Sequence, residues 1–164
     1  MRRNGDTPCK RFLVVVADDL GRSSGINRAI AEAHDRGIVT AASMMVGGEA
    51  FQEAVQIALD RPQLAVGLHV TLCDGRAVLP PSSIPCLADA EGHLEKTPAK
   101  AWVKYTRPAL LSQIEREVEA QFDHLSAAGI RPSHVDCHHH LHMHPFLFEV
   151  ICRQALKREV GWIR

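Results

Sequence analysis

Short apolar runs alternate with helix-periodic segments, and this alternation constrains the fold more than any other feature of the chain. Four runs rich in apolar or β-branched residues predict strands, at 12–17, 38–46, 65–72 and 134 to about 138. Four segments with apolar residues at helical spacing predict helices, at about 24–36, 51–59, 111–128 and 145–157. Continuous apolar strands are typical of parallel sheets that are buried on both faces. Repeated strand–helix units therefore predict an α/β domain with a mostly parallel sheet.

Local signals set the expected boundaries of these elements. Ser23 or Ser24 is predicted to cap the first helix, and Gly37 to end it. The proline-punctuated stretch 73–107 predicts a long irregular loop, and loops of that length are usually functional or mobile. Residues 160–164 resemble the start of a fifth strand. We expect a disordered tail at 1–10 and a single domain over 11–164.

Composition excludes several classes of protein. The chain has 164 residues, with 19 basic and 19 acidic side chains, so its charge gives no reason to expect a nucleic-acid partner or an anionic membrane. No stretch reaches the roughly 20 apolar residues that a transmembrane helix needs, and the N-terminus lacks a secretory signal pattern. The five cysteines are odd in number and form no Cys-x-x-Cys pair. We therefore expect a cytoplasmic protein without a disulfide framework or a cysteine zinc site.

Six of the ten histidines lie between His134 and His144. If this run is a strand, its histidines and Asp136 share one face, with His139 as the exception, while apolar residues occupy the other face. A strand with that pattern is a plausible metal site. A purification tag or a histidine-rich surface loop is the alternative, but a tag would lie at a terminus and lack the interleaved apolar residues.

Polar residues also stand near the carboxyl ends of the other predicted strands. Asp18 and Asp19 follow the first strand, His69 lies late in the third, and Asp136 and His138 lie late in the fourth. Ligands gather at this edge in parallel α/β folds, so we expect these side chains to meet. One aspartate could then bind a metal while its neighbour accepts a proton from an activated water. Taken singly, the aspartates could simply cap a loop, and His69 could be a core residue.

The motifs together resemble the YdjC/ChbG-like carbohydrate deacetylases. The resemblance rests on Ala-Asp-Asp-Leu-Gly at 17–21, Asn27, Gly-Leu-His at 67–69 and His-Val-Asp-Cys-His-His-His at 134–140. Further matches are the segment 37–43, Asp89-x-x-Gly92 and the pair Glu117 and Gln121, although that pair could be only a solvated helix face. Segments 41–46, 74–81 and 102–105 look closer to the hopanoid-biosynthesis branch of the family, called HpnK.

The resemblance implies a (β/α) barrel that removes acetyl groups from N-acetylated amino sugars or glycolipids with a divalent metal ion, Mg²⁺ or Zn²⁺. It assigns Asp19, His69 and His138 as metal ligands and Asp18 as the general base. We also assign Asp136, His140, His142 and Asn27 to substrate binding or to support of the ligands. In the HpnK branch, the substrate would be an N-acetylglucosaminyl hopanoid.

A complete barrel of this kind takes about 250 residues, so we expect only four to five βα units here. By resemblance, the absent part would include a late histidine that acts as general acid. We therefore expect a truncated product or an incomplete gene model, with impaired activity and an exposed sheet edge that favours homo-oligomers. The alternatives are a different barrel metallohydrolase and a non-catalytic fragment that binds sugar or metal.

Overall fold

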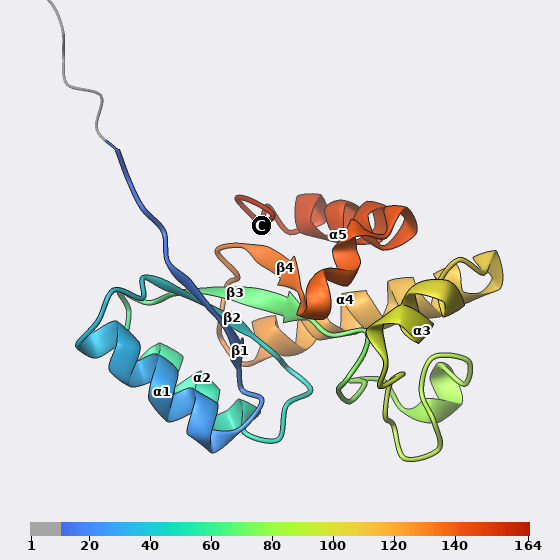
Figure 1. The fold of residues 1–164 in the computed structure, drawn as a ribbon, viewed down its shortest axis with the longest axis horizontal. Coiled ribbons are helices and arrows are strands. Elements are labelled where there is room, and N and C mark those ends of the chain that lie inside the picture. The colour runs from blue at the N-terminus through green and yellow to red at the C-terminus, as the bar shows by residue number, and fades with distance from the viewer. Residues whose placement is uncertain (1–10) are drawn as a thin grey trace, which may run out of the picture.

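The structure, a computed structural model, describes residues 11–164, and the predicted tail at 1–10 lies outside the described residues. Its sheet has four parallel strands in the order β1-β2-β3-β4 (Figure 1). They span Val16–Leu20, Ala41–Met44, Ala65–Val70 and Val135–Cys137. Ile163 adds a parallel bridge to Val135, as expected for the start of a fifth strand. Strand order that follows chain order is the arrangement of a (β/α) barrel, so the predicted partial barrel is confirmed.

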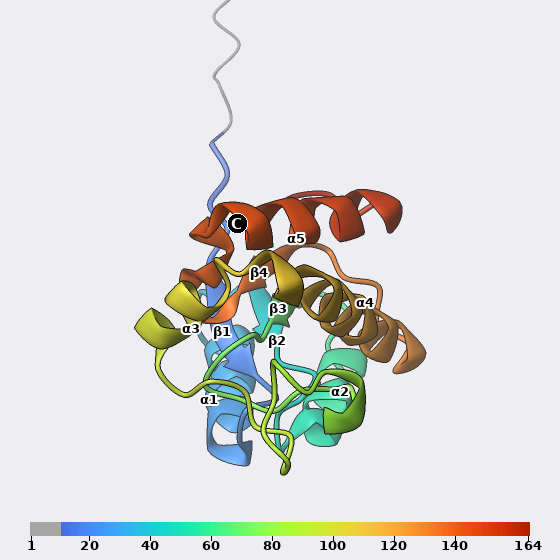
Figure 2. The same ribbon diagram turned by 90° about the vertical axis from the view of Figure 1, so that its right-hand side faces the viewer.

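Five α-helices accompany the sheet: α1 (Ser24–Asp35), α2 (Phe51–Leu59), α3 (Pro98–Lys104), α4 (Leu111–Ala127) and α5 (Pro145–Lys157). Helix α1 packs on β1 and α2, while α4 packs on β3 and α5 (Figures 1 and 2). Ser23 caps α1 through its hydroxyl, which accepts from the backbone N–H of Ile26. The four predicted helices therefore begin where the sequence predicts them, whereas α3 was not predicted.

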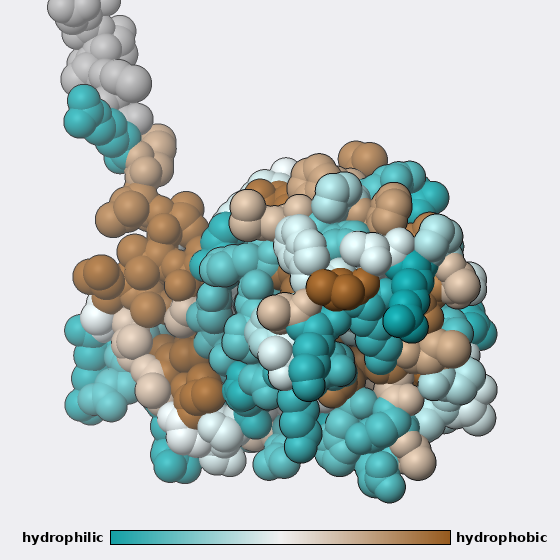
Figure 3. Space-filling view, turned by 45° about the vertical axis from the view of Figure 1, so that its right-hand side comes forward, coloured by the Kyte–Doolittle hydropathy of each residue, from teal (hydrophilic) through white to brown (hydrophobic). Residues whose placement is uncertain are grey.

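The first strand is displaced relative to its prediction. It begins at Val16 and includes Asp18 and Asp19, whereas the prediction placed it at 12–17 and ended it before the acids. The reason is pairing, since residue-by-residue register with β2 begins only at Val16. The preceding Phe12, Leu13 and Val14 are exposed. Figure 3 shows a hydrophobic surface, in brown, on the left side of the molecule. The second and third strands are likewise shorter than their apolar runs, ending at Met44 and Val70.

The stretch 73–107 is less irregular than predicted. It contains α3, where Pro98 occupies the first turn, a position at which proline costs no helical hydrogen bond. Tyr105 is fully buried and donates its hydroxyl hydrogen bond to the carbonyl of Leu72. Glu117 and Gln121 are not a solvated pair, because both are buried and hydrogen-bond to backbone groups that follow β3. The Glu117 carboxylate accepts from two backbone N–H groups, those of Val78 and Leu79, at 2.8 and 3.0 Å.

The histidine run is not one continuous strand. Strand β4 ends at Cys137, and the chain then forms a broken 3₁₀ segment, His138–Met143. His139 and His140 both have a φ of +54°, in the left-handed region, so the period-two alternation stops there. The prediction that these imidazoles share one face is therefore wrong beyond His138.

Among the described residues, no helix is both long and apolar enough to cross a membrane.

Candidate metal centre

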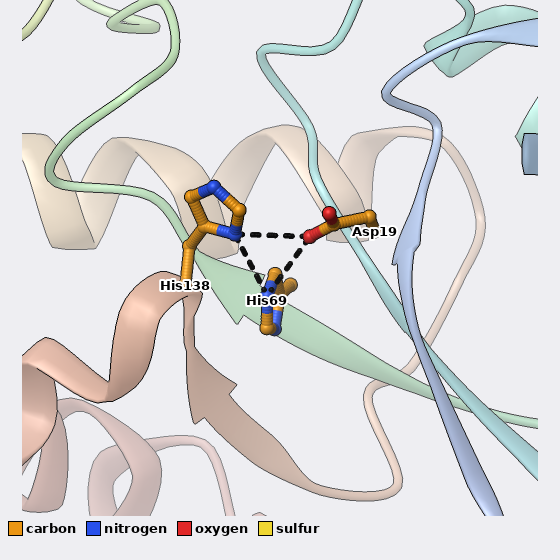
Figure 4. Close-up of side chains that lie close together, drawn as sticks. All are labelled: Asp19, His69 and His138. Atoms are coloured by element: carbon orange, nitrogen blue, oxygen red, sulfur yellow. Dashed lines mark hydrogen bonds and ion pairs between the residues drawn. The ribbon is translucent and has the colours of Figure 1, made fainter. Parts of the chain in front are cut away.

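Three side chains from three different segments converge at the carboxyl edge of the sheet. Asp19 comes from β1, His69 from β3, and His138 directly follows β4 (Figure 4). Oδ1 of Asp19 lies 2.9 Å from Nδ1 of His138 and 3.2 Å from Nε2 of His69, and the two nitrogens are 3.3 Å apart. We call this group the Asp19–His69–His138 triad. The structure thus brings together the three residues that the resemblance assigns as ligands, at the edge where their positions near strand ends predicted them.

The triad fits a divalent metal ion. Two ligand atoms that each lie about 2.1 Å from one metal are separated by roughly 3.0 Å in octahedral geometry and 3.4 Å in tetrahedral geometry. The observed separations, 2.9, 3.2 and 3.3 Å, lie within 0.1 Å of this range. Oδ1 of Asp19 is also buried and accepts no well-aligned hydrogen bond. A buried carboxylate oxygen that faces two imidazole nitrogens is a donor set suited to Mg²⁺ or Zn²⁺.

A bulge in β1 explains how two adjacent aspartates reach the same site. Successive side chains of a regular strand point to opposite faces, but the register of β1 shifts between Ala17 and Leu20. Asp19 lies in the left-handed region with a φ of +67°, which aspartate tolerates better than most residues. As a result, Asp18 and Asp19 each have a carboxylate oxygen within 4.8 Å of His69. Bulges next to active sites commonly re-aim side chains in this way.

Two sets of polar contacts, one of them buried, hold the surroundings of the triad. Asp136 accepts a 2.6 Å hydrogen bond from Nδ1 of His69 and is almost completely buried. Arg164 bridges two acids, with Nη2 2.5 Å from Oδ1 of Asp18 and 2.8 Å from Oδ2 of Asp136. Arg164 therefore connects the exposed carboxylate of Asp18 to the buried carboxylate of Asp136, which accepts the hydrogen bond of His69.

The electrostatics of the metal-free site favour a charged carboxylate beside a protonated imidazole. The imidazoles of His138 and His69 hold the pKa of Asp19 well below its usual range, against the opposing effect of burial. Burial alone would lower the pKa of His69, but its bonds to Asp136 and Asp19 outweigh burial and raise the pKa to about 9. At neutral pH a metal ion must therefore displace a proton from His69.

This pKa predicts how the stability of the metal-free chain depends on pH. A raised pKa means that folding favours the protonated form of His69. Its contribution is complete below the unfolded pKa of about 6.5 and is lost as the pH rises through about 9. We expect urea unfolding in the presence of a chelator to show a falling free energy of unfolding across this window. The fall should be much smaller in a His69→Asn variant, and an equal fall in both proteins would contradict the assignment.

A basic residue lies beside the triad. Arg22 follows β1, and its Nη1 lies 3.4 Å from Oδ2 of Asp19 and 2.9 Å from Nε2 of His138. Its other terminal nitrogen donates to Asp74, which follows β3, at 2.9 Å. Arg22 and Asp74 also line an open pocket of about 360 Å³, whose wall includes Arg76, His93, Met45 and Leu94. The triad therefore lies at the edge of a pocket with charged and apolar walls.

Arg22 is expected to oppose metal binding. A guanidinium only donates hydrogen bonds, so Nε2 of His138 accepts from Arg22 and the proton of a neutral ring lies on Nδ1, which faces Asp19. An ion in the triad requires Nδ1 free of its proton and is repelled by the positive charge nearby. We expect Arg22→Met to tighten Zn²⁺ binding roughly three- to tenfold in calorimetric titrations. Weaker binding in this variant would show instead that Arg22 helps to organise the ligands.

The remaining predicted site residues lie farther out. Asn27 is fully buried: its side-chain oxygen accepts from the N–H of Gly21, and its amide donates to the carbonyl of Ala50. It therefore holds the loop after Asp19 and has no surface that a substrate could touch. His140 is exposed, with its ring 6.1 Å from the ring of His142. His142 is half-buried, and neither imidazole hydrogen-bonds to a residue of the triad in the described part of the chain.

Known proteins with similar sequences identify the family of this chain. The family model described as YdjC-like protein matches residues 12–164. The chain belongs to the YdjC-like family. A carbohydrate deacetylase of Brevibacillus brevis is 39% identical over 143 residues, covering 87% of this chain and 55% of that protein. A chitooligosaccharide deacetylase of Citrobacter koseri is 38% identical over 153 residues, covering 93% of this chain and 58% of that protein.

A solved structure shows the same fold. A protein of Enterococcus faecalis V583, described as a cellobiose-phosphate cleavage protein, superposes with a TM-score of 0.79 and 29% sequence identity. The match covers 91% of this YdjC-like chain and 57% of the other. The chain thus spans between half and three fifths of the length of the relatives that it matches.

Sequence reasoning missed three charged residues of this YdjC-like site. Arg22, Asp74 and Arg164 were not predicted, yet each lies just beyond the end of a strand or a strand-like segment. The strand-end rule that selected Asp19 and His69 applies to them equally. The signal was therefore present, but charged residues at loop starts are common, and only the spatial contacts distinguish these three.

Proposed function

We propose that this YdjC-like chain carries the metal-binding part of an enzyme that removes the acetyl group from N-acetylated amino sugars. The observation that carries the proposal is the Asp19–His69–His138 triad with Asp18 beside it, at the edge of an open pocket. The relatives named as deacetylases of carbohydrates and chitooligosaccharides support the same substrate class. Metal hydrolysis of an amide needs ligands, a base and space for the acyl group, and these residues offer all three.

The triad would hold the ion through Oδ1 of Asp19, Nε2 of His69 and Nδ1 of His138. A divalent ion supplies Lewis acidity there, which polarises the amide carbonyl and makes water more acidic. Asp18 would accept the proton that the attacking water loses, because its carboxylate is exposed and lies near His69 without belonging to the triad. Asp136 would keep the proton of His69 on Nδ1.

The pocket beside the triad supports a sugar-sized ligand. Its volume of about 360 Å³ lies within the usual range of small-molecule sites. Its walls combine charged groups such as Arg76 and His93 with the apolar side chains of Met45 and Leu94. A saccharide ring presents hydroxyls at its edge and C–H groups on its faces, so it suits walls of this mixed character.

Within this class we propose an N-acetylglucosaminyl hopanoid as the substrate. The support is the resemblance of segments 41–46, 74–81 and 102–105 to the HpnK branch. A membrane glycolipid would present its sugar to the pocket while its apolar part stays outside. The expected result is a higher kcat/KM for an N-acetylglucosaminyl hopanoid than for diacetylchitobiose, and the reverse order would remove the hopanoid proposal while leaving deacetylation intact.

The general proposal is tested by metal analysis and acetate release together. We expect the purified chain to bind about one Zn²⁺ or Mg²⁺. Acetate release from N-acetylglucosaminides should occur only in the metal-loaded chain, and more slowly than in a relative of full length, because the chain spans just over half of such a relative. Phosphate esters serve as the comparison substrates, because a different metallohydrolase would prefer them. A folded, metal-loaded chain that hydrolyses phosphate esters, or that binds N-acetylated sugars without acetate release, would contradict the proposal.

A further inference from the structure

A buried chain of hydrogen bonds extends from the triad across three strands. Nδ1 of His69 donates to Oδ1 of Asp136 at 2.6 Å. The hydroxyl of Ser43 donates to Oδ2 of the same carboxylate at 2.6 Å, and Nε2 of His134 lies 3.0 Å from that hydroxyl oxygen. All four side chains are at most 2% exposed, so water does not compete for these bonds.

The direction of each bond follows from the number of available protons. Ser43 has one hydroxyl proton, and it goes to Asp136, because a carboxylate only accepts. The oxygen of Ser43 must therefore accept from Nε2–H of His134. Burial lowers the pKa of His134, so the ring is neutral and its Nδ1, which faces the hydroxyl of Ser133 at 2.9 Å, carries no proton. The single hydroxyl proton of Ser133 then goes to this Nδ1 and not to the nearby carbonyl of Val66, which already accepts from the backbone N–H of Ser133 at 2.8 Å. With that assignment, one pattern of protons satisfies the whole chain.

Gly67 makes this contact across the sheet possible. Ser43 of β2 is the register partner of Gly67 on β3, and His134 immediately precedes β4 on the other side. A Cβ built at Gly67 would lie 2.5 Å from ring atoms of His134. The missing side chain therefore leaves the space through which His134 reaches Ser43. The other face of the ring stacks on Trp162, with centroids 4.5 Å apart and planes 13° from parallel.

We propose that Ser43 and His134 are positioning residues that fix Asp136, so that His69 keeps its proton on Nδ1 and presents Nε2 to the triad. The proposal rests on the proposed function, since it assigns these two residues to the support of the same metal site. Within residues 11–164, neither side chain hydrogen-bonds to a residue of the triad, and neither residue lines the pocket. Their effect reaches the metal through the orientation of one carboxylate, to which Arg164 also binds.

The test compares variants that remove single bonds of the chain. Ser43→Ala should weaken Zn²⁺ binding about tenfold, the lower end of the effect of losing support around a metal ligand. His134→Phe keeps a flat ring against Gly67 and Trp162 but loses the N–H group, and we expect about a threefold loss. Ser43→Thr retains the hydroxyl and should restore the affinity. Ser126→Ala is the matched control, because its hydroxyl bonds to the carbonyl of Phe122 within α4.

A second readout separates positioning from simple packing. In ¹⁵N-histidine-labelled protein loaded with Zn²⁺, we expect the spectrum to show the Nδ1–H form of His69 and the Nε2–H form of His134. Ser43→Ala should shift the Nδ1–H resonance of His69, whereas Ser126→Ala should not. Unchanged affinity and an unchanged His69 resonance in Ser43→Ala would overturn the proposal.

The two proposals fail differently. A wild-type chain that binds Zn²⁺ but releases no acetate would contradict the deacetylase function and leave the positioning role standing. A wild-type chain that binds no divalent metal would contradict both. Weaker Zn²⁺ binding in Ser43→Ala without rescue by Ser43→Thr would assign the effect to packing and would overturn the hydrogen-bond argument.

Discussion

Replacing Asp19 with asparagine is expected to weaken Zn²⁺ binding by more than roughly 100-fold, and to remove any metal-dependent hydrolysis with it. Losing the support of a ligand already costs about 10- to 100-fold, so losing the only charged ligand of the triad should cost more. The carboxylate also lies between two imidazoles, at 2.9 and 3.2 Å, and its charge offsets part of the ion's charge. Calorimetric titration with Zn²⁺ measures the change directly.

The choice of asparagine matters, because Asp19 occupies the left-handed region with a φ of +67°. Asparagine tolerates that conformation as aspartate does, whereas alanine would add backbone strain to the loss of the ligand. Asp60→Asn is the matched control, since Asp60 is exposed at the end of α2. Equal Zn²⁺ affinity in Asp19→Asn and wild type, with both folded, would show that the ion binds elsewhere.

The fold was largely predictable because it depends on patterns that the sequence carries locally. Apolar runs and helical spacing predicted the parallel sheet and every long helix, and Ser23 was one of the two predicted caps of α1. Strand ends were less predictable, since they depend on pairing. The run that begins at Phe12 is apolar enough for a strand, but register with β2 begins only at Val16. Helix α3 was missed because its apolar spacing is short and prolines surround it.

The candidate site was predictable in its main residues and not in its details. The strand-end rule brings Asp19, His69 and His138 together, because parallel strands present their carboxyl ends at one edge. The turn at His139 and His140 removes those imidazoles from the face that a regular strand would have given them. That turn depends on left-handed backbone, which no residue pattern in the run encodes.

Burial was the other property that the sequence concealed. Glu117 and Gln121 stand four residues apart on α4, the spacing of an ordinary solvated pair. In the structure, Gln121 donates its amide hydrogen to the carbonyl of Thr71 at 2.7 Å and accepts from the N–H of the same residue. After β3 has ended, Gln121 and Glu117 thus supply the hydrogen bonds that a neighbouring strand would otherwise give to the backbone. Only the three-dimensional path of the stretch after β3 shows that its backbone needs them.

The second large effect is expected at Asp18. Asp18→Asn should leave Zn²⁺ binding within about threefold of wild type and lower kcat for acetate release by roughly 10²- to 10⁴-fold, the usual contribution of a general base. The reason is that Asp18 lies outside the triad while its carboxylate reaches within 4.8 Å of His69. KM should change little, because the amide keeps the size of the side chain and a hydrogen bond from Arg164.

The measurement therefore has two independent parts, metal affinity and turnover, and their combination decides the role of Asp18. Loss of both together would make Asp18 a metal ligand, in keeping with the alternative grouping of Asp18, His69 and Asp136. Loss of neither would leave Asp18 as a surface partner of Arg164, to which it is bound at 2.5 Å. Loss of turnover alone assigns it as the base. The bulge in β1 would then serve the reaction directly, because it allows two consecutive residues, the base Asp18 and the ligand Asp19, to reach the same site.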